Sequence, residues 1–190
     1  VYENLWDYKV GQYHSYFRHD HLDLLNTREC RKTFKDEINQ MLERNGVVFY
    51  LDTDGKIKRQ LPAEMDSLIQ KLKIHTADQR LNELIQQATE DIRKPELKDR
   101  TYALEKLWDA FERMKTFYSP DKKKSSDQVF QKAASATPQF ASVLTDESQC
   151  LTKIGNTYQI RHFETDKIQI TDPKLIDYLY YRMLSLISLC

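Results

Sequence analysis

Residues 100–118, RTYALEKLWDAFERMKTFY, place their apolar side chains at steps of three and four. On an α-helix this spacing forms one apolar stripe, whereas on a β-strand the same residues would fall on both faces. The segment therefore predicts an amphipathic helix, with Trp108 and Phe111 in the core of the protein. On the polar face we expect Asp109 to pair with Arg113, one turn away. The apolar stripe consists of Leu104, Leu107, Trp108, Phe111, Met114 and Tyr118.

The same helical period recurs along most of the chain, which contains only four glycines and five prolines. Residues 29–45 predict a helix that Asn45-Gly46 ends, because glycine accepts the left-handed backbone conformation without steric cost. Helices are also expected from Pro62 onward, and Thr76 with Gln79 resembles a capping box that opens one of them.

Two further helix boundaries are predicted from single residues. Ser125 or Ser126 is a suitable cap for a helix that holds Val129 and Phe130. A helix over 139–153 is expected to end at Gly155 and Asn156, since both residues tolerate a positive φ.

The last helix is predicted from Pro173 to Cys190 and is apolar on nearly every side. Such a helix needs neighbours all round, so we expect it at the centre of the core or in a homodimer or partner interface. Arg182 is the one charged residue between Tyr178 and Cys190 and needs a partner, for which Glu164 is the nearest candidate along the chain. The expected interface residues are Tyr178, Tyr181, Leu184 and Ile187.

One β element is predicted within this helical pattern. Residues 47–60 combine a β-branched and aromatic run with Asp54-Gly55 and the alternating Lys56-Ile57-Lys58, which is typical of a hairpin with a tight turn. The predicted fold class is therefore mainly α, a helical bundle with one small β-hairpin at about 47–60. We expect two parts: 1–61, a helix plus the hairpin, and 62–190, a helical domain.

The composition limits the function classes. Lys+Arg and Asp+Glu balance at 29 each, so binding of nucleic acid would need a local basic patch. The three cysteines form no metal pattern, and we expect reduced thiols in a cytoplasmic protein without a membrane segment. The chain begins at Val1 and stops at Cys190 within a helical pattern, which suits a processed chain or part of a longer protein.

Known catalytic motifs are absent from the sequence: there is no GxGxxG, P-loop, GxSxG or HExxH pattern. The stretch HSYFRHDH holds His14, His19 and His21, and the last two have the spacing of ligands on one strand face. A metal site would need a further ligand, and no second cluster supplies it. The sequence favours a polar surface here, and we predict no metal and no cofactor.

Residues 151–167, LTKIGNTYQIRHFETDK, are the strongest candidate site. Arg161 offers a planar fork of donors suited to phosphate, and His162 beside it is a candidate general acid or base on a ribose hydroxyl. Glu164 is the candidate that orients Arg161, and Lys153 and Asn156 are candidate contacts to nucleic acid. The alternative is a salt bridge between Arg161 and Glu164 that braces a loop.

A family resemblance bears on these alternatives. The stretches ALEKLWDAFERMKT, LTKIGNTYQIRHFETDKIQI and YLYYRMLSLISL resemble the C-terminal helical part of bacterial abortive-infection proteins, which is similar to the HEPN group. The resemblance covers residues 62–190. It implies an all-α bundle, frequent homodimers, a role in antiviral defence, and metal-independent RNase activity in the active members of the group.

The chain departs from that group at the catalytic pair. The RNases carry an arginine, then four to six intervening residues and then a histidine, whereas here Arg161 and His162 are adjacent. Two functions therefore stay open. One is an anti-phage defence module that binds or cleaves RNA through Arg161, His162 and Glu164. The other is a catalytically silent domain that dimerises or binds a partner defence protein.

Overall fold

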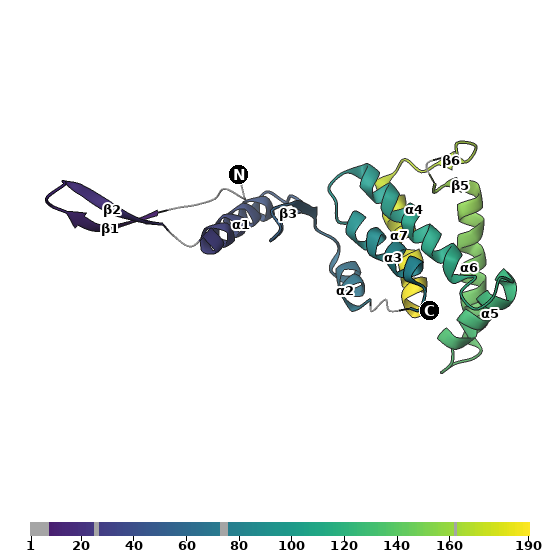
Figure 1. Ribbon diagram of the computed structural model, residues 1–190. Coiled ribbons are helices and arrows are strands. Elements are labelled where there is room, and N and C mark those ends of the chain that lie inside the picture. The colour runs from purple at the N-terminus through teal and green to yellow at the C-terminus, as the bar shows by residue number, and fades with distance from the viewer. Residues whose placement is uncertain (1–7, 25–26, 73–75, 162) are drawn as a thin grey trace. The chain divides into compact units, whose positions relative to one another are not determined.

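The computed structural model describes residues 8–24, 27–72, 76–161 and 163–190. Its contacts divide the chain into an N-terminal unit, Val1–Gln60, and a C-terminal unit, Leu61–Cys190. Seven helices and three small two-stranded sheets lie in the described residues, so the predicted mainly α fold is confirmed. We describe each unit on its own (Figure 1).

The N-terminal unit holds a β-hairpin that the sequence did not reveal. Strand β1, Tyr8–His14, pairs antiparallel with β2, His19–Leu24. The turn between them has four residues and contains no glycine; instead Arg18 adopts a positive φ of 52°. The hairpin was missed because its turn lacks the Asn-Gly or Asp-Gly signal that marks a tight turn in a sequence.

The second hairpin of the N-terminal unit lies where it was predicted. Strands β3, Phe49–Leu51, and β4, Ile57–Arg59, pair antiparallel across a turn in which Gly55 has a φ of 78°. Helix α1, Thr27–Arg44, precedes them, and Gly46, two residues after its end, has a φ of 65°. Asn39 joins the two elements, because its amide donates to the Leu51 carbonyl at 2.9 Å and accepts from the Leu51 N–H at 2.6 Å.

The C-terminal unit contains five larger helices after the short α2. They are α2 Ala63–Lys71, α3 Gln79–Asp91, α4 Leu97–Met114, α5 Lys122–Ala133, α6 Phe140–Thr157 and α7 Pro173–Leu189. Between α6 and α7, β5 Tyr158–Gln159 and β6 Ile168–Gln169 form a two-residue parallel pair. Figure 1 shows α3, α4 and α7 side by side, with α5 and α6 together beyond them.

Helix α4 is the centre of this bundle, since it packs on α3 and on α7. Its predicted core face is confirmed: Trp108 is 5% exposed and Phe111 is fully buried. Tyr180 of α7 is also fully buried, and its hydroxyl donates to the Ala88 carbonyl of α3 at 3.1 Å. A buried hydroxyl with such a partner costs little, so α7 can occupy the core.

Three predicted helix boundaries were wrong. Asp78, not Thr76, caps α3, and its carboxylate accepts from the Leu81 N–H. Asp121 caps α5 through the N–H groups of Lys123 and Lys124, so the lysine run forms the first helical turn. Aspartate is as good a cap as serine or threonine, and the sequence alone did not rank them.

The third boundary concerns Gly155, which does not end α6. The helix runs on to Thr157, and Gly155 is buried within it against the indole of Trp108. A Cβ at this position would lie 1.9 Å from Cη2 of Trp108. Glycine is therefore required here for close packing between α6 and α4 and not for a left-handed turn.

None of the helices in the described part of the chain combines the length and the hydropathy that crossing a bilayer requires.

Candidate functional site

Arg161 lies in the loop after β5 and is held by α4. Its Nε and Nη2 donate to the same carboxylate oxygen of Asp109, at 3.0 and 2.7 Å. Asp109 is on the polar face of α4, so this pair fastens the loop to the central helix. The predicted pair between Asp109 and Arg113 was wrong, because Arg113 donates to Asp78 at 2.6 Å and braces the start of α3.

Glu164 is shared between two cations of the same loop. Its carboxylate lies 3.0 Å from Nζ of Lys167 and 3.7 Å from Nη1 of Arg161. Lys167 also donates to the carbonyl of Gly155 at 2.8 Å, near the end of α6. Asp109, Arg161, Glu164 and Lys167 thus form a connected group, here called the Arg161 brace, that ties the loop to α4 and α6.

Charge is balanced within the Arg161 brace, which has two carboxylates and two cations. Burial works to lower the pKa of Arg161, but the hydrogen bonds and charge of Asp109, together with the charge of Glu164, raise it overall. The side chains of Arg161 and Asp109 are 29% and 31% exposed. A phosphate at Arg161 would have to compete with two carboxylates already in place, which weakens the phosphate-binding hypothesis.

The other predicted site residues are not part of this group. Lys153 and Asn156 are exposed on α6, and within the described residues neither shares a hydrogen bond or ion pair with Arg161. His162 lies outside the described residues. The structure therefore brings together Arg161 and Glu164 and adds Asp109 and Lys167, which were not predicted.

A second ion group lies beside the brace on the same helix. Glu112 of α4 pairs with Lys115 and with Lys122 of α5. Lys115 is buried; its Nζ donates to the Thr152 hydroxyl of α6 at 2.9 Å and lies 4.3 Å from the ring centre of Phe111. Burial lowers the pKa of Lys115 even with Glu112 beside it, while for Glu112 the hydrogen bonds from both lysines outweigh burial and lower its pKa.

Arg182 has a different partner from the one predicted. Its Nε and Nη2 donate to the two carboxylate oxygens of Glu147 on α6, at 2.6 and 2.8 Å, so the pair is bidentate. Nη1 of Arg182 lies 3.3 Å from the hydroxyl of Tyr178, and Nη2 lies 3.3 Å from Sγ of Cys150. Arg182 needed a partner as expected, but the proposed pairing with Glu164 was wrong because α6 supplies a closer carboxylate.

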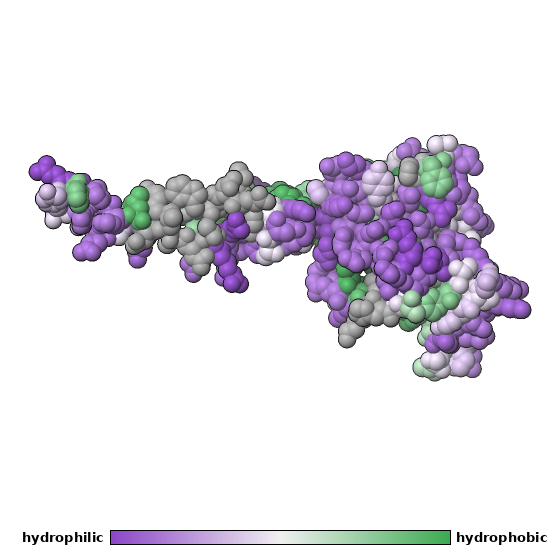
Figure 2. Space-filling model, viewed as in Figure 1, coloured by the Kyte–Doolittle hydropathy of each residue, from purple (hydrophilic) through white to green (hydrophobic). Residues whose placement is uncertain are grey.

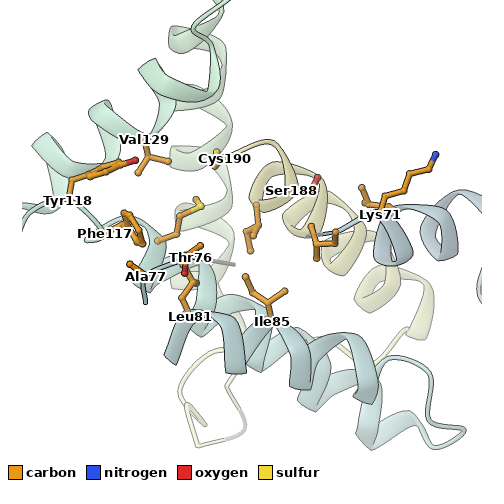
Figure 3. Close-up of a pocket in the computed structure, with 14 residues that line it drawn as sticks. Lys71, Thr76, Ala77, Leu81, Ile85, Phe117, Tyr118, Val129, Ser188 and Cys190 are labelled. Carbon is orange, nitrogen blue, oxygen red and sulfur yellow. The ribbon is translucent and has the colours of Figure 1, made fainter. Parts of the chain in front are cut away.

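The C-terminal unit also contains a pocket of about 610 Å³ between α2, α3, α5 and α7 (Figure 3). Its walls are mostly aliphatic, and its described lining includes no Asp, Glu or His. Although much of Cys190 is exposed, burial of its thiol raises the pKa to about 12, so the thiol stays protonated at neutral pH. The described part of its lining therefore offers neither an acid–base pair nor an activated nucleophile.

No family model, curated protein or solved structure matches this chain. The resemblance to the HEPN group accordingly stays a prediction, and function has to be argued from the geometry.

Proposed function

We propose that the C-terminal unit is a non-catalytic interaction domain that binds a second copy of itself through α6 and α7. The observation that carries this proposal is a group of exposed apolar side chains on these two helices. Leu175, Tyr178 and Leu189 of α7 are 53%, 54% and 52% exposed, and Phe140 and Val143 of α6 are 48% and 50% exposed.

We infer from the helical period that these side chains lie on one side of the unit. Tyr178 is one turn before Arg182 and Leu189 is two turns after it, while Val143 is one turn before Glu147. Because the ion pair of Arg182 with Glu147 joins the two helices, the apolar side chains lie around that pair. We call this surface the α6–α7 face: Phe140, Val143, Glu147, Leu175, Tyr178, Arg182 and Leu189.

Three of the four residues first predicted for an interface lie elsewhere. Leu184 is fully buried, Ile187 is 8% exposed, and Tyr181 is half-buried against the core. Only Tyr178 belongs to the α6–α7 face. Neighbouring helices surround the buried side of α7, so the self-association proposed here rests on its outer side alone.

A second copy fits this face because the face carries its own complementary charges. A two-fold interface is reciprocal: if one residue contacts a second residue of the other copy, the second residue also contacts the first across the axis. Arg182 and Glu147 are 24% and 31% exposed and lie side by side, so each could also face the opposite charge across a two-fold axis. Exposed apolar patches mark interaction sites, and aromatic and arginine side chains are enriched in protein interfaces.

The anti-phage RNase hypothesis requires Arg161 to be available to phosphate. It has less support from the geometry, because Arg161 is engaged by Asp109 and lies near Glu164. A role in defence against phage is compatible with a self-associating domain and stays a proposal that comes from the family resemblance.

Sedimentation velocity over a range of protein concentrations tests the self-association. The unaltered chain should shift from monomer to dimer as its concentration rises. Leu175→Asp should move the midpoint of this transition to a concentration about tenfold higher or more, because a buried charge at an interface is costly. Leu175 lies in the first turn of α7, where an acidic residue suits the helix dipole, so the fold should be retained.

Leu97→Asp is the matched control. Leu97 is 45% exposed and, like Leu175, lies in the first turn of its helix, so the chemical change is the same, but Leu97 is outside the α6–α7 face. It should leave the midpoint unchanged. A chain that stays monomeric at every concentration, or equal effects of both variants, would contradict the proposal.

A further inference from the structure

The hairpin of β1 and β2 gathers three imidazoles on one face. His14 of β1 is directly opposite His19 of β2, and His21 follows two residues later on the same strand. Alternate residues of a strand share a face, and directly paired residues on neighbouring strands are close together, so all three side chains meet. One ring nitrogen from each of the three lies within 4.8 Å of the others.

We propose that His14, His19 and His21, the histidine triad, bind one divalent transition-metal ion of the zinc class. Imidazole nitrogen is a preferred ligand of Zn²⁺, and three protein ligands with one open position form a known type of zinc site. His19 and His21 have the spacing of ligands on one strand face, and the pairing of His19 with His14 adds the third ligand. The fourth position would hold water.

The distances allow this with small side-chain rotations. With Zn–N bonds of about 2.0–2.1 Å, two nitrogens of a tetrahedral site lie about 3.4 Å apart. The triad nitrogens therefore need to approach by no more than about 1.4 Å from their 4.8 Å limit. All three side chains are exposed and not packed in a core, so rotation about χ1 and χ2 is open to them.

A bound ion would also stabilise the hairpin. From Lys9 to Leu22 every residue except Gly11 is exposed, and β1 and β2 form a sheet of only two strands. A lone two-stranded hairpin is only marginally stable in water. An ion that joins His14 on one strand to His19 and His21 on the other would clamp the strands, because the free energy of metal binding adds to that of folding.

Phe17 covers one side of the triad. Its ring stacks on His14, with 5.3 Å between ring centres and an interplanar angle of 16°, and lies 5.8 Å from the ring of His19. An apolar group beside the ligands limits access of water and restricts the rings to fewer orientations. The turn that supplies Phe17 therefore contributes to ordering the imidazoles.

Titration of the whole, metal-free chain with Zn²⁺ tests the proposal by calorimetry and by NMR of the imidazole nitrogens. Calorimetry should give one ion per chain. The ring signals of His14, His19 and His21 should shift together and saturate at that ratio, while those of His75 and His162 should not move. Shifts spread over all five histidines, or no saturation at one ion, would overturn the proposal.

Substitution separates the ligands from the surrounding surface. His14→Ala, His19→Ala and His21→Ala should each weaken Zn²⁺ binding by about tenfold or more, since even removing a group that only orients a ligand costs that much. Asp20→Ala is the matched control, because Asp20 lies between His19 and His21 but points to the opposite face. Unchanged affinity in the three histidine variants, or an equal loss in Asp20→Ala, would refute the site.

Discussion

At the scale of single residues, the contact between Gly155 and Trp108 shows how the C-terminal unit is locked together. Gly155 is buried on α6, and the six-membered ring of Trp108 on α4 occupies the space where a Cβ would be. The Arg161 brace adds a second connection, because it joins the loop after β5 to both α4 and α6. The absence of a side chain at Gly155 and the large ring of Trp108 thus set the distance between α6 and α4, which are far apart in the sequence.

Gly155→Ala should lower the free energy of unfolding by about 1–3 kcal/mol, because the added methyl group overlaps the indole. Asn156→Ala, one residue later and exposed, is the control and should change stability by less than about 0.5 kcal/mol. Trp108→Phe removes the ring atoms that clash, so Gly155→Ala should cost less in that background. Equal costs in both backgrounds, measured by urea denaturation, would contradict this packing.

The two residues also show what a sequence can and cannot reveal. Trp108 was placed in the core correctly, since its period of three and four is a local property of the helix. Gly155 was misread as a helix end, because a glycine needed for space and a glycine needed for a positive φ look the same in a sequence. The pairing of Asp109 was not predictable either, because its partner Arg161 lies 52 residues away in the sequence.

At the scale of the elements, ion pairs and a hydrogen bond connect α4 and the residue that follows it to the neighbouring helices. Glu112 is on α4, Lys115 directly follows its last residue, Lys122 is on α5, and the Thr152 hydroxyl is on α6. The individual helices were predictable because their periods are local. Their mutual packing was not, because it depends on which charged residue of one helix meets which of another, and charged residues are interchangeable in a hydropathy pattern.

Acid should weaken this junction. Since the pKa of Glu112 is lowered in the folded protein, the stability it contributes is present above its usual pKa of 4.5 and is lost as pH falls through the lowered value. Glu112→Gln should cost roughly 3 kcal/mol at neutral pH, because Lys115 would stay buried without its carboxylate. It should also flatten the decline of the melting temperature below about pH 5.

Melting curves from pH 7 to 3 check both effects. Glu96→Gln is a suitable control, since the side chain of Glu96 is 62% exposed and its partner Lys98 is similarly exposed. It should leave the pH profile unchanged. A Glu112→Gln profile that runs parallel to that of the unaltered chain would show that Glu112 does not contribute to acid sensitivity.

At the scale of the whole molecule, the two units offer different surfaces. The N-terminal unit exposes aromatic and imidazole side chains on its first hairpin, among them Tyr16 at 86% exposure. The C-terminal unit has a largely hydrophilic surface in the view of Figure 2, and the exposed apolar residues of its α6–α7 face are the basis of the proposed self-association. The proposed metal binding and the proposed self-association thus concern separate units, so each can be tested without the other.

Whether the C-terminal unit is an interaction domain or an RNase depends mainly on Arg161. If Arg161 is structural, the loop of residues 158–170 is held on α4 and the unit has no free guanidinium at the predicted site. If Arg161 binds phosphate, its pairing with Asp109 must be dispensable for folding. These alternatives predict opposite effects on stability and on RNA.

A double-mutant cycle of Arg161→Ala and Asp109→Ala distinguishes them. The chain has two tryptophans, so in a Trp6→Phe background the fluorescence of Trp108 reports unfolding of the C-terminal unit alone. We expect Arg161→Ala to lower the free energy of unfolding by about 1–2 kcal/mol, with most of that loss absent when Asp109 is already alanine. The RNase would be favoured, and the structural role contradicted, by one combined result. The unaltered chain would bind or cleave RNA, and Arg161→Ala would lose that activity while keeping its stability.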